Sequence, residues 1–173
     1  VDPALIEYLD DVRRRWADRV VAELRKRGLQ ATGSLHRLRG VDGRRVDIGP
    51  GEVDGLALDV GSGRVTVVEA KRLQPTYSPP EFADELDQFA SGQYVDRVLR
   101  KVMWVRDNWA DVRAHLVRWC GIADAPAVPT VVQACIVTKY ESYAQVVDDR
   151  VPIVSGARLC SVFDTQRSWL FDR

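Results

Sequence analysis

The fold is decided by residues 51–71, which read GEVDGLALDVGSGRVTVVEAK. Two apolar runs of strand length, 53–60 and 64–71, flank a Gly-Ser-Gly turn at 61–63. Aliphatic and β-branched residues on both sides of a glycine-containing turn are typical of an antiparallel hairpin. The sequence therefore predicts a largely buried β-hairpin over 53–71.

Three ionisable residues, Asp54, Glu69 and Lys71, interrupt these apolar runs. Strand side chains alternate between faces with a period of two, so Glu69 and Lys71 share a face. A two-residue turn puts Asp54 directly opposite Lys71, with Glu69 one step diagonal. All three groups are then expected to converge, whereas a three-residue turn would send Asp54 to the other face.

Two carboxylates that lie close together repel each other, and a divalent cation relieves that repulsion. Asp54, Glu69, the backbone carbonyl of Ala70 and water molecules make a plausible site for Mg²⁺ or Mn²⁺. Lys71 would orient or deprotonate a water molecule, or stabilise charge developing on a phosphate. The alternative is a cross-strand ion pair between Asp54 and Lys71 on a solvated sheet face.

The rest of the chain surrounds this hairpin with helices and further strands. Apolar spacing predicts helices over 3–27, 81–106, 109–119 and 157–170, and strands over 131–138 and 151–154. The polar, glycine-rich segment 29–50 is expected to be loop or edge strand. The order α-β-β-α-α-β-β-α predicts an α/β fold, one domain over 1–173 with a mixed central sheet flanked by helices.

Gly-Glu-Val-Asp ending at Asp54, followed after 14 residues by Glu-Ala-Lys, resembles the motif of the PD-(D/E)xK nuclease superfamily. The similarity is to its restriction-endonuclease-like and Holliday-junction-resolvase-like domains. It implies a restriction-endonuclease-like fold, Asp54 and Glu69 as ligands of Mg²⁺ or Mn²⁺, and Lys71 as the catalytic lysine. The implied activity is metal-dependent phosphodiester hydrolysis by a nuclease, endonuclease rather than exonuclease, in restriction, phage defence or repair. DNA is the favoured substrate over RNA.

The same resemblance implies further site residues. Many members add an acid from the first helix, for which Asp18 is the candidate and Glu23 the competitor; the alternative for both is a solvated helix acid. Glu52 either lies beside the metal or caps the strand. The helix after the motif often supplies a glutamine or a basic residue; Gln88 and Gln93 are the candidates, with plain helix surface as the alternative.

The formal net charge of zero hides two unlike regions. Residues 12–45 contain eleven Lys and Arg against three acids, a balance of +8, whereas 52–87 contain three against eight, a balance of −5. A solvated, charge-mixed surface is the plain interpretation. The basic region is the candidate for contacts with a phosphate backbone, through Arg13, Arg14, Arg15, Arg25, Lys26, Arg27, Arg44 and Arg45.

The composition excludes several classes of protein. No window approaches 18 consecutive apolar residues, and three isolated cysteines with two histidines make neither a disulfide framework nor a four-ligand zinc site. A cytoplasmic protein is expected, with no membrane partner and with a homodimer allowed. The opening Val-Asp-Pro suggests a domain cut from a longer protein with further domains.

Two rival functions stay open. One is a catalytically silent nuclease-like module that binds nucleic acid or a partner protein in a larger assembly. The other is a small-molecule enzyme or structural α/β domain, in which Asp54, Glu69 and Lys71 form a surface ion-pair cluster. Placement of Asp54 and Glu69 on opposite sheet faces would favour the second.

Overall fold

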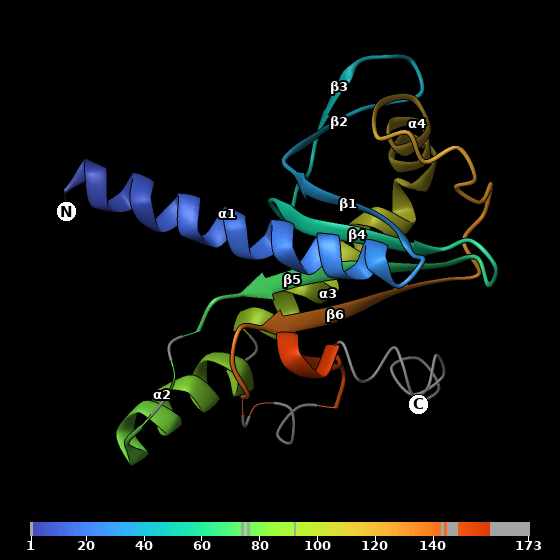
Figure 1. Cartoon of the computed structure of the whole chain (residues 1–173). Coiled ribbons are helices and arrows are strands. Elements are labelled where there is room, and N and C mark those ends of the chain that lie inside the picture. Colours follow the sequence, from blue (N-terminus) through green and yellow to red (C-terminus); the bar gives the residue numbers. More distant parts are fainter. Residues whose placement is uncertain are drawn as a thin grey trace.

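A five-stranded mixed sheet, in the order β1-β4-β5-β6-β7, forms the centre of the molecule (Figure 1). The structure is a computed structural model that describes residues 2–73, 75, 77–91, 93–142, 144 and 149–159. Strands β1 (Gln30–Leu35), β4 (Val53–Asp59) and β5 (Arg64–Lys71) pair antiparallel. Strands β6 (Val131–Thr138) and β7 (Ile153–Ser155) extend the sheet parallel to β5. The predicted α/β class with a mixed sheet is therefore confirmed.

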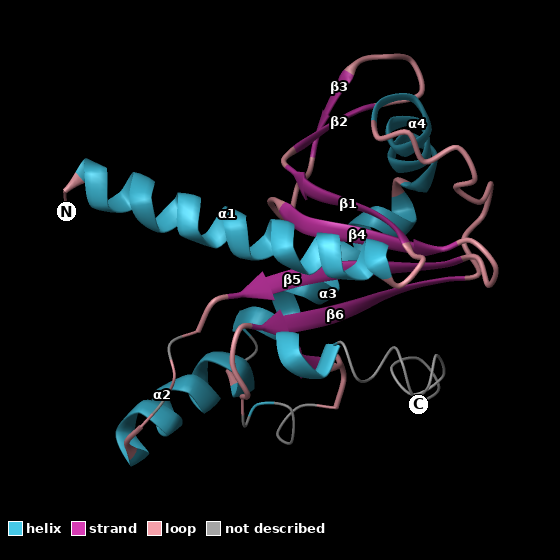
Figure 2. Cartoon of the chain, in the orientation of Figure 1, coloured by secondary structure: helices cyan, strands magenta, loops and turns pink. Residues whose placement is uncertain are grey.

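Helices cover both faces of this sheet (Figure 2). The C-terminal half of α1 (Pro3–Lys26) buries Val20, Val21 and Leu24 against one face. Helices α3 (Gln93–Asp107) and α4 (Trp109–Trp119) contribute to the core on the other face. Burial of apolar side chains on both faces is what holds the hairpin in place.

The structure divides two of the predicted segments into smaller elements. The helix expected over 81–106 is two helices, α2 (Pro79–Ala90) and α3, because the chain leaves the helix at Ser91. The segment 29–50 contains β1, which is the outer strand beside β4, so the edge-strand alternative is correct for 30–35. The same segment also forms a separate hairpin of β2 (Arg37–Arg39) and β3 (Arg45–Asp47).

The predicted order α-β-β-α-α-β-β-α therefore lacks β1, β2 and β3. The sequence left these segments as loop or edge strand because their apolar alternation is weak, and because β1 pairs with β4 rather than with its neighbour in the chain, β2. The last predicted strand, 151–154, is β7 at 153–155. Of the predicted final helix 157–170, residues 157–159 are helical and the remainder lies outside the described residues.

Candidate active site

The hairpin register differs from the predicted one by two residues. Asp59 pairs with Arg64, so residues 60–63 form a four-residue turn rather than a two-residue one. Continuing that register puts Asp54 opposite Glu69 and not opposite Lys71. A shift of two residues keeps every side chain on its face, because the strand period is two. The predicted convergence of the three groups therefore survives the error in register.

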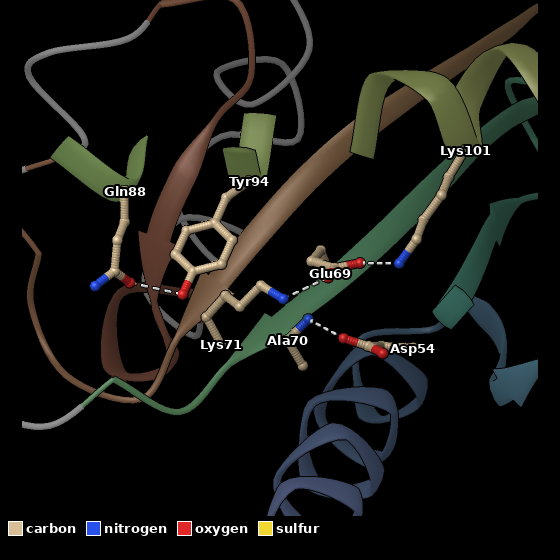
Figure 3. A network of polar contacts seen from close by, with 7 residues as sticks. All are labelled: Asp54, Glu69, Ala70, Lys71, Gln88, Tyr94 and Lys101. Carbon is tan, nitrogen blue, oxygen red and sulfur yellow. Dashed lines mark hydrogen bonds and ion pairs between the residues drawn. The ribbon is translucent and has the colours of Figure 1, made fainter. Parts of the chain in front are cut away.

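Asp54 lies where β4 and β5 separate. The last ladder pair is Gly55 with Val68, and beyond it the Ala70 N–H donates to Oδ2 of Asp54 at 2.8 Å (Figure 3). The N–H and C=O of one strand residue point to the same edge of the strand. The Ala70 carbonyl is therefore directed toward the same gap as the Asp54 carboxylate.

Glu69 lies between two ammonium groups. Lys71 Nζ is 2.6 Å from its Oε1, and Lys101 Nζ is 2.5 Å from its Oε2 (Figure 3). Glu69 is 3% exposed, and Lys101, which comes from α3, is 4% exposed. Burial by itself raises the pKa of Glu69, but the two lysines outweigh it and hold the pKa below its ordinary value.

The Asp54 carboxyl has the opposite balance. Burial raises its pKa from 3.8 to about 6 and the negative charge of Glu69 adds to the increase, against the Ala70 hydrogen bond and the two lysines. Among the described side chains Asp54 forms no ion pair, so the alternative interpretation, an ion pair between Asp54 and Lys71, is not found there. Both lysine ammonium groups of the site pair with Glu69. Asp54 has no cation in contact with it in the described part of the chain, and we call it the under-compensated carboxyl.

Helices α2 and α3 place two further side chains beside Lys71. Lys71 Nζ lies 4.8 Å from the centre of the Tyr94 ring, a cation–π geometry. The Tyr94 hydroxyl in turn donates to Oε1 of Gln88 at 2.7 Å (Figure 3). Gln88 thus contacts the site through Tyr94, whereas Gln93 is exposed at the start of α3.

Among the candidate additional acids, Asp18 of α1 lies across Gly33 from the backbone of Asp54. A methyl group on Gly33, the neighbour of Gly55 in β1, would lie 3.6 Å from Asp18 Oδ1 and 3.9 Å from the Asp54 carbonyl oxygen. Both distances are ordinary van der Waals contacts, so Asp18 packs beside β1 without requiring a glycine at position 33.

The other two candidates have different partners. Glu23 forms ion pairs with Lys26 and Arg27, at 3.2 and 3.1 Å. Glu52 accepts a hydrogen bond from Ser34 and pairs with His36 Nε2 at 2.9 Å. These two contacts agree better with Glu52 as a cap of the strand than with Glu52 as a neighbour of the metal.

The candidate basic residues lie in three different places. Arg13, Arg14 and Arg15 lie about one helical turn before Asp18, on the half of α1 that projects past the sheet (Figure 1). Arg44 and Arg45 belong to the β2–β3 arm, which connects the end of β1 to the start of β4. The triplet 25–27 lies beside Gln30, which pairs with Leu58, roughly 13 Å along β4 from Asp54. That triplet is at the opposite end from the candidate site.

Several of these cations already have acidic partners. Arg13 pairs with Asp10 at 3.1 Å, Arg15 with Asp11 at 2.5 Å and Arg44 with Asp42 at 3.4 Å. Such exposed pairs are weak and exchange readily with other anions. They do not prevent contact with a phosphate backbone.

The donor set suits a sparsely ligated hard cation. In the described part of the chain no three His, Cys, Asp or Glu side chains gather around one point. Mg²⁺ is commonly held by one or two carboxylates and completes its shell with water and substrate phosphates. Asp54, one oxygen of Glu69 and the Ala70 carbonyl fit that pattern, and burial together with the charge of Glu69 raises the pKa of Asp54 to about 6 in spite of the two lysines.

Lys101 is the site residue that the sequence analysis missed. It follows Val98 by three residues and precedes Val105 by four, so it occupies the apolar stripe of α3. A lysine on a buried helix face is rare unless it is paired, and this position was the available signal. Its partner could not be named, because Glu69 is 32 residues away in the chain.

None of the helices in the described ranges is long and apolar enough to cross a membrane. Compared with protein-family models, curated proteins and solved structures, the chain matches none of them.

Proposed function

We propose that this chain is a restriction-endonuclease-like domain of the PD-(D/E)xK type that hydrolyses phosphodiester bonds, with DNA as the favoured substrate and Mg²⁺ or Mn²⁺ as cofactor. One observation carries the proposal. Asp54, Glu69 and Lys71 converge in a partly buried site at the end of the hairpin where β4 and β5 separate. Burial of two carboxylates and two lysines is costly and is retained most readily where chemistry uses them.

The burial and contacts of each residue indicate its role in this proposal. Asp54, the Ala70 carbonyl and Glu69 Oε1 would hold a divalent cation. When bound, that cation polarises the scissile phosphate and lowers the pKa of a coordinated water. Lys71 has 18% of its side chain exposed, so its ammonium can leave Glu69 and meet a phosphate oxygen or the attacking water.

Tyr94 limits where the Lys71 ammonium can go. The ring lies on one side of Nζ at 4.8 Å and is itself fixed by Gln88, at 2.7 Å from the hydroxyl. A lysine that is held by an aromatic face and a carboxylate is restricted to few conformations, which favours catalysis by pre-organisation. Gln88 and Tyr94 are positioning residues in this proposal.

The substrate would approach from the end of the sheet that carries Asp54. The projecting half of α1 presents Arg13, Arg14 and Arg15 at that end, whereas Arg44 and Arg45 lie at the tip of the β2–β3 arm, where the Val41 N–H donates to Asp111 of α4. The arginines of α1 would contact the phosphate backbone without selecting a base sequence. The triplet 25–27 has no part in this approach.

The silent-module alternative rests on a specific feature of Glu69. Both of its carboxylate oxygens are held by lysines, and a metal must displace Lys71 to reach Oε1. If that displacement is too costly, the domain binds nucleic acid without cutting it. Measurement of cleavage separates the two functions.

The experiment incubates the protein with supercoiled, linear and single-stranded DNA and with RNA, in Mg²⁺, Mn²⁺ or EDTA. We expect cleavage with either metal, no cleavage in EDTA, and loss of at least a hundredfold in rate for Lys71→Met and Asp54→Asn. Lys26→Met, a lysine at the far end of α1, is the matched control and should cut normally. Binding without cleavage in every metal would favour the silent module, and unchanged cutting by Lys71→Met would overturn the assignment of the site.

A second comparison tests the direction of approach. Neutralising Arg14 with glutamine should weaken DNA binding severalfold and reduce its salt dependence. The matched variant Arg27→Gln, at the opposite end of α1, should leave binding unchanged. Equal losses in both variants would refute an approach along the projecting half of the helix.

A further inference from the structure

Lys101 is not one of the reacting groups in the proposed chemistry. Its ammonium contacts Glu69 Oε2 at 2.5 Å, and only 5% of its side chain is exposed. Lys71, on the other oxygen of Glu69, is more than three times as exposed, at 18%. The two lysines are therefore not equivalent, because only Lys71 is free to exchange its carboxylate for a substrate or a solvent molecule.

The position of Lys101 also fixes which part of Glu69 is available. Oε2 is held from α3, on the apolar stripe between Val98 and Val105, and cannot turn away without leaving a buried ammonium unpaired. Oε1 is the oxygen that Lys71 can release. A cation that approaches from the Asp54 side therefore meets one oxygen of Glu69 and not both.

The charge balance of the site follows from the same contacts. Two carboxylates, Asp54 and Glu69, face two ammonium groups, Lys71 and Lys101. In sites that hold two divalent ions, about 4 Å apart, each ion is balanced by acidic ligands. Here a fixed ammonium already occupies the side of Glu69 that a second ion would need.

We infer that Lys101 is a built-in counter-cation that takes the place of a second metal ion, so that this site binds a single divalent cation between Asp54 and Glu69 Oε1. This inference rests on the proposed function and specifies its metal stoichiometry. Lys101 is a positioning residue, since it acts through Glu69 and is shielded from the substrate.

Mn²⁺ binding, followed by electron paramagnetic resonance of the free ion without substrate, tests the inference independently of turnover. The wild-type protein should bind one Mn²⁺ per chain and show no spectrum of a coupled Mn²⁺ pair. Lys101→Met keeps the volume and removes the charge, so it should bind its first Mn²⁺ roughly tenfold more tightly or better. Lys101→Arg, which keeps the charge, and the distant control Lys26→Met should stay within about twofold of wild type.

The inference is overturned by two Mn²⁺ ions in the wild type, by a coupled pair spectrum, by an unchanged or weakened first affinity in Lys101→Met, or by a first affinity in Lys101→Arg that departs from wild type by more than about twofold. The wild-type stoichiometry and the Lys101→Arg affinity decide the matter even if the methionine variant fails to fold. Failure of the proposed function looks different. A wild type that takes up no Mn²⁺ at millimolar concentration removes the nuclease proposal as well, whereas a protein that cuts DNA with two bound ions removes only this inference.

Discussion

Replacing Asp54 with asparagine should stabilise the folded protein at neutral pH, although it removes a residue of the proposed active site. The amide is nearly isosteric with the carboxylate, and its oxygen can still accept the hydrogen bond from the Ala70 N–H. The change therefore isolates the cost of keeping a charge at this position. Residues that serve function at the expense of stability are common in active sites.

The size of the effect follows from the pKa. In the folded protein burial and Glu69 raise the pKa of Asp54 from 3.8 to about 6. A raised carboxyl pKa means that the folded state holds the proton more tightly. The contribution of Asp54 to stability is thus fully present below pH 3.8 and is lost as the pH rises through about 6. The whole difference is about 3 kcal/mol, of which about 2 kcal/mol develops between about pH 4.5 and about pH 7.5.

The assay is urea unfolding of the wild type and Asp54→Asn in EDTA at about pH 4.5 and about pH 7.5. The stability gained by the variant should be about 2 kcal/mol larger at the higher pH. Asp84→Asn changes an exposed carboxylate on α2 and should show no such increase. A gain that does not grow with pH, or a variant that is less stable than wild type at about pH 7.5, would refute the assignment of Asp54 as the under-compensated carboxyl.

Glu69→Gln should destabilise the protein by about 3 kcal/mol or more at neutral pH, since it leaves the buried Lys101 ammonium without its carboxylate. Adding Lys101→Met should recover part of that loss in urea unfolding, and a double variant no more stable than Glu69→Gln would argue against the pair. Gly156→Ala should cost about 1–3 kcal/mol, because the new methyl group would lie 2.6 Å from Cη2 of Trp16; an unchanged melting temperature would contradict this packing. Burial raises the pKa of the free thiol of Cys135 to about 12, so a thiol reagent at about pH 8 should leave it unmodified until the protein is denatured, and rapid labelling of Cys135 in the native state would count against its burial.

The hairpin and the grouping of its charges were accessible from the sequence because they depend on local rules. Period-two alternation places Asp54, Glu69 and Lys71 on related faces for any even shift of register. The expected two-residue turn was wrong, yet its error was two residues and the grouping persisted. A one-residue error would have separated Asp54 from Glu69.

Other features depended on contacts between segments that are distant in the chain. Strand β1 is weakly patterned, and its pairing with β4 becomes visible only in the folded sheet. The approach of Asp18 depends on how α1 crosses β1 at Gly33, which no local pattern specifies. The division of residues 81–106 into α2 and α3 likewise depends on how these two helices pack against each other.

By itself, the sequence determined that a buried hairpin carries two carboxylates and a lysine at one end, because alternation and turn chemistry act within a few residues. Only the tertiary structure decided how those charges are balanced. Helix α3 brings Lys101 across 32 residues to Glu69, while the separation of β4 and β5 leaves Asp54 with a backbone N–H and no ion pair among the described side chains. Electrostatic balance depends on distances in three dimensions and on burial, and neither quantity is encoded in the spacing along the chain.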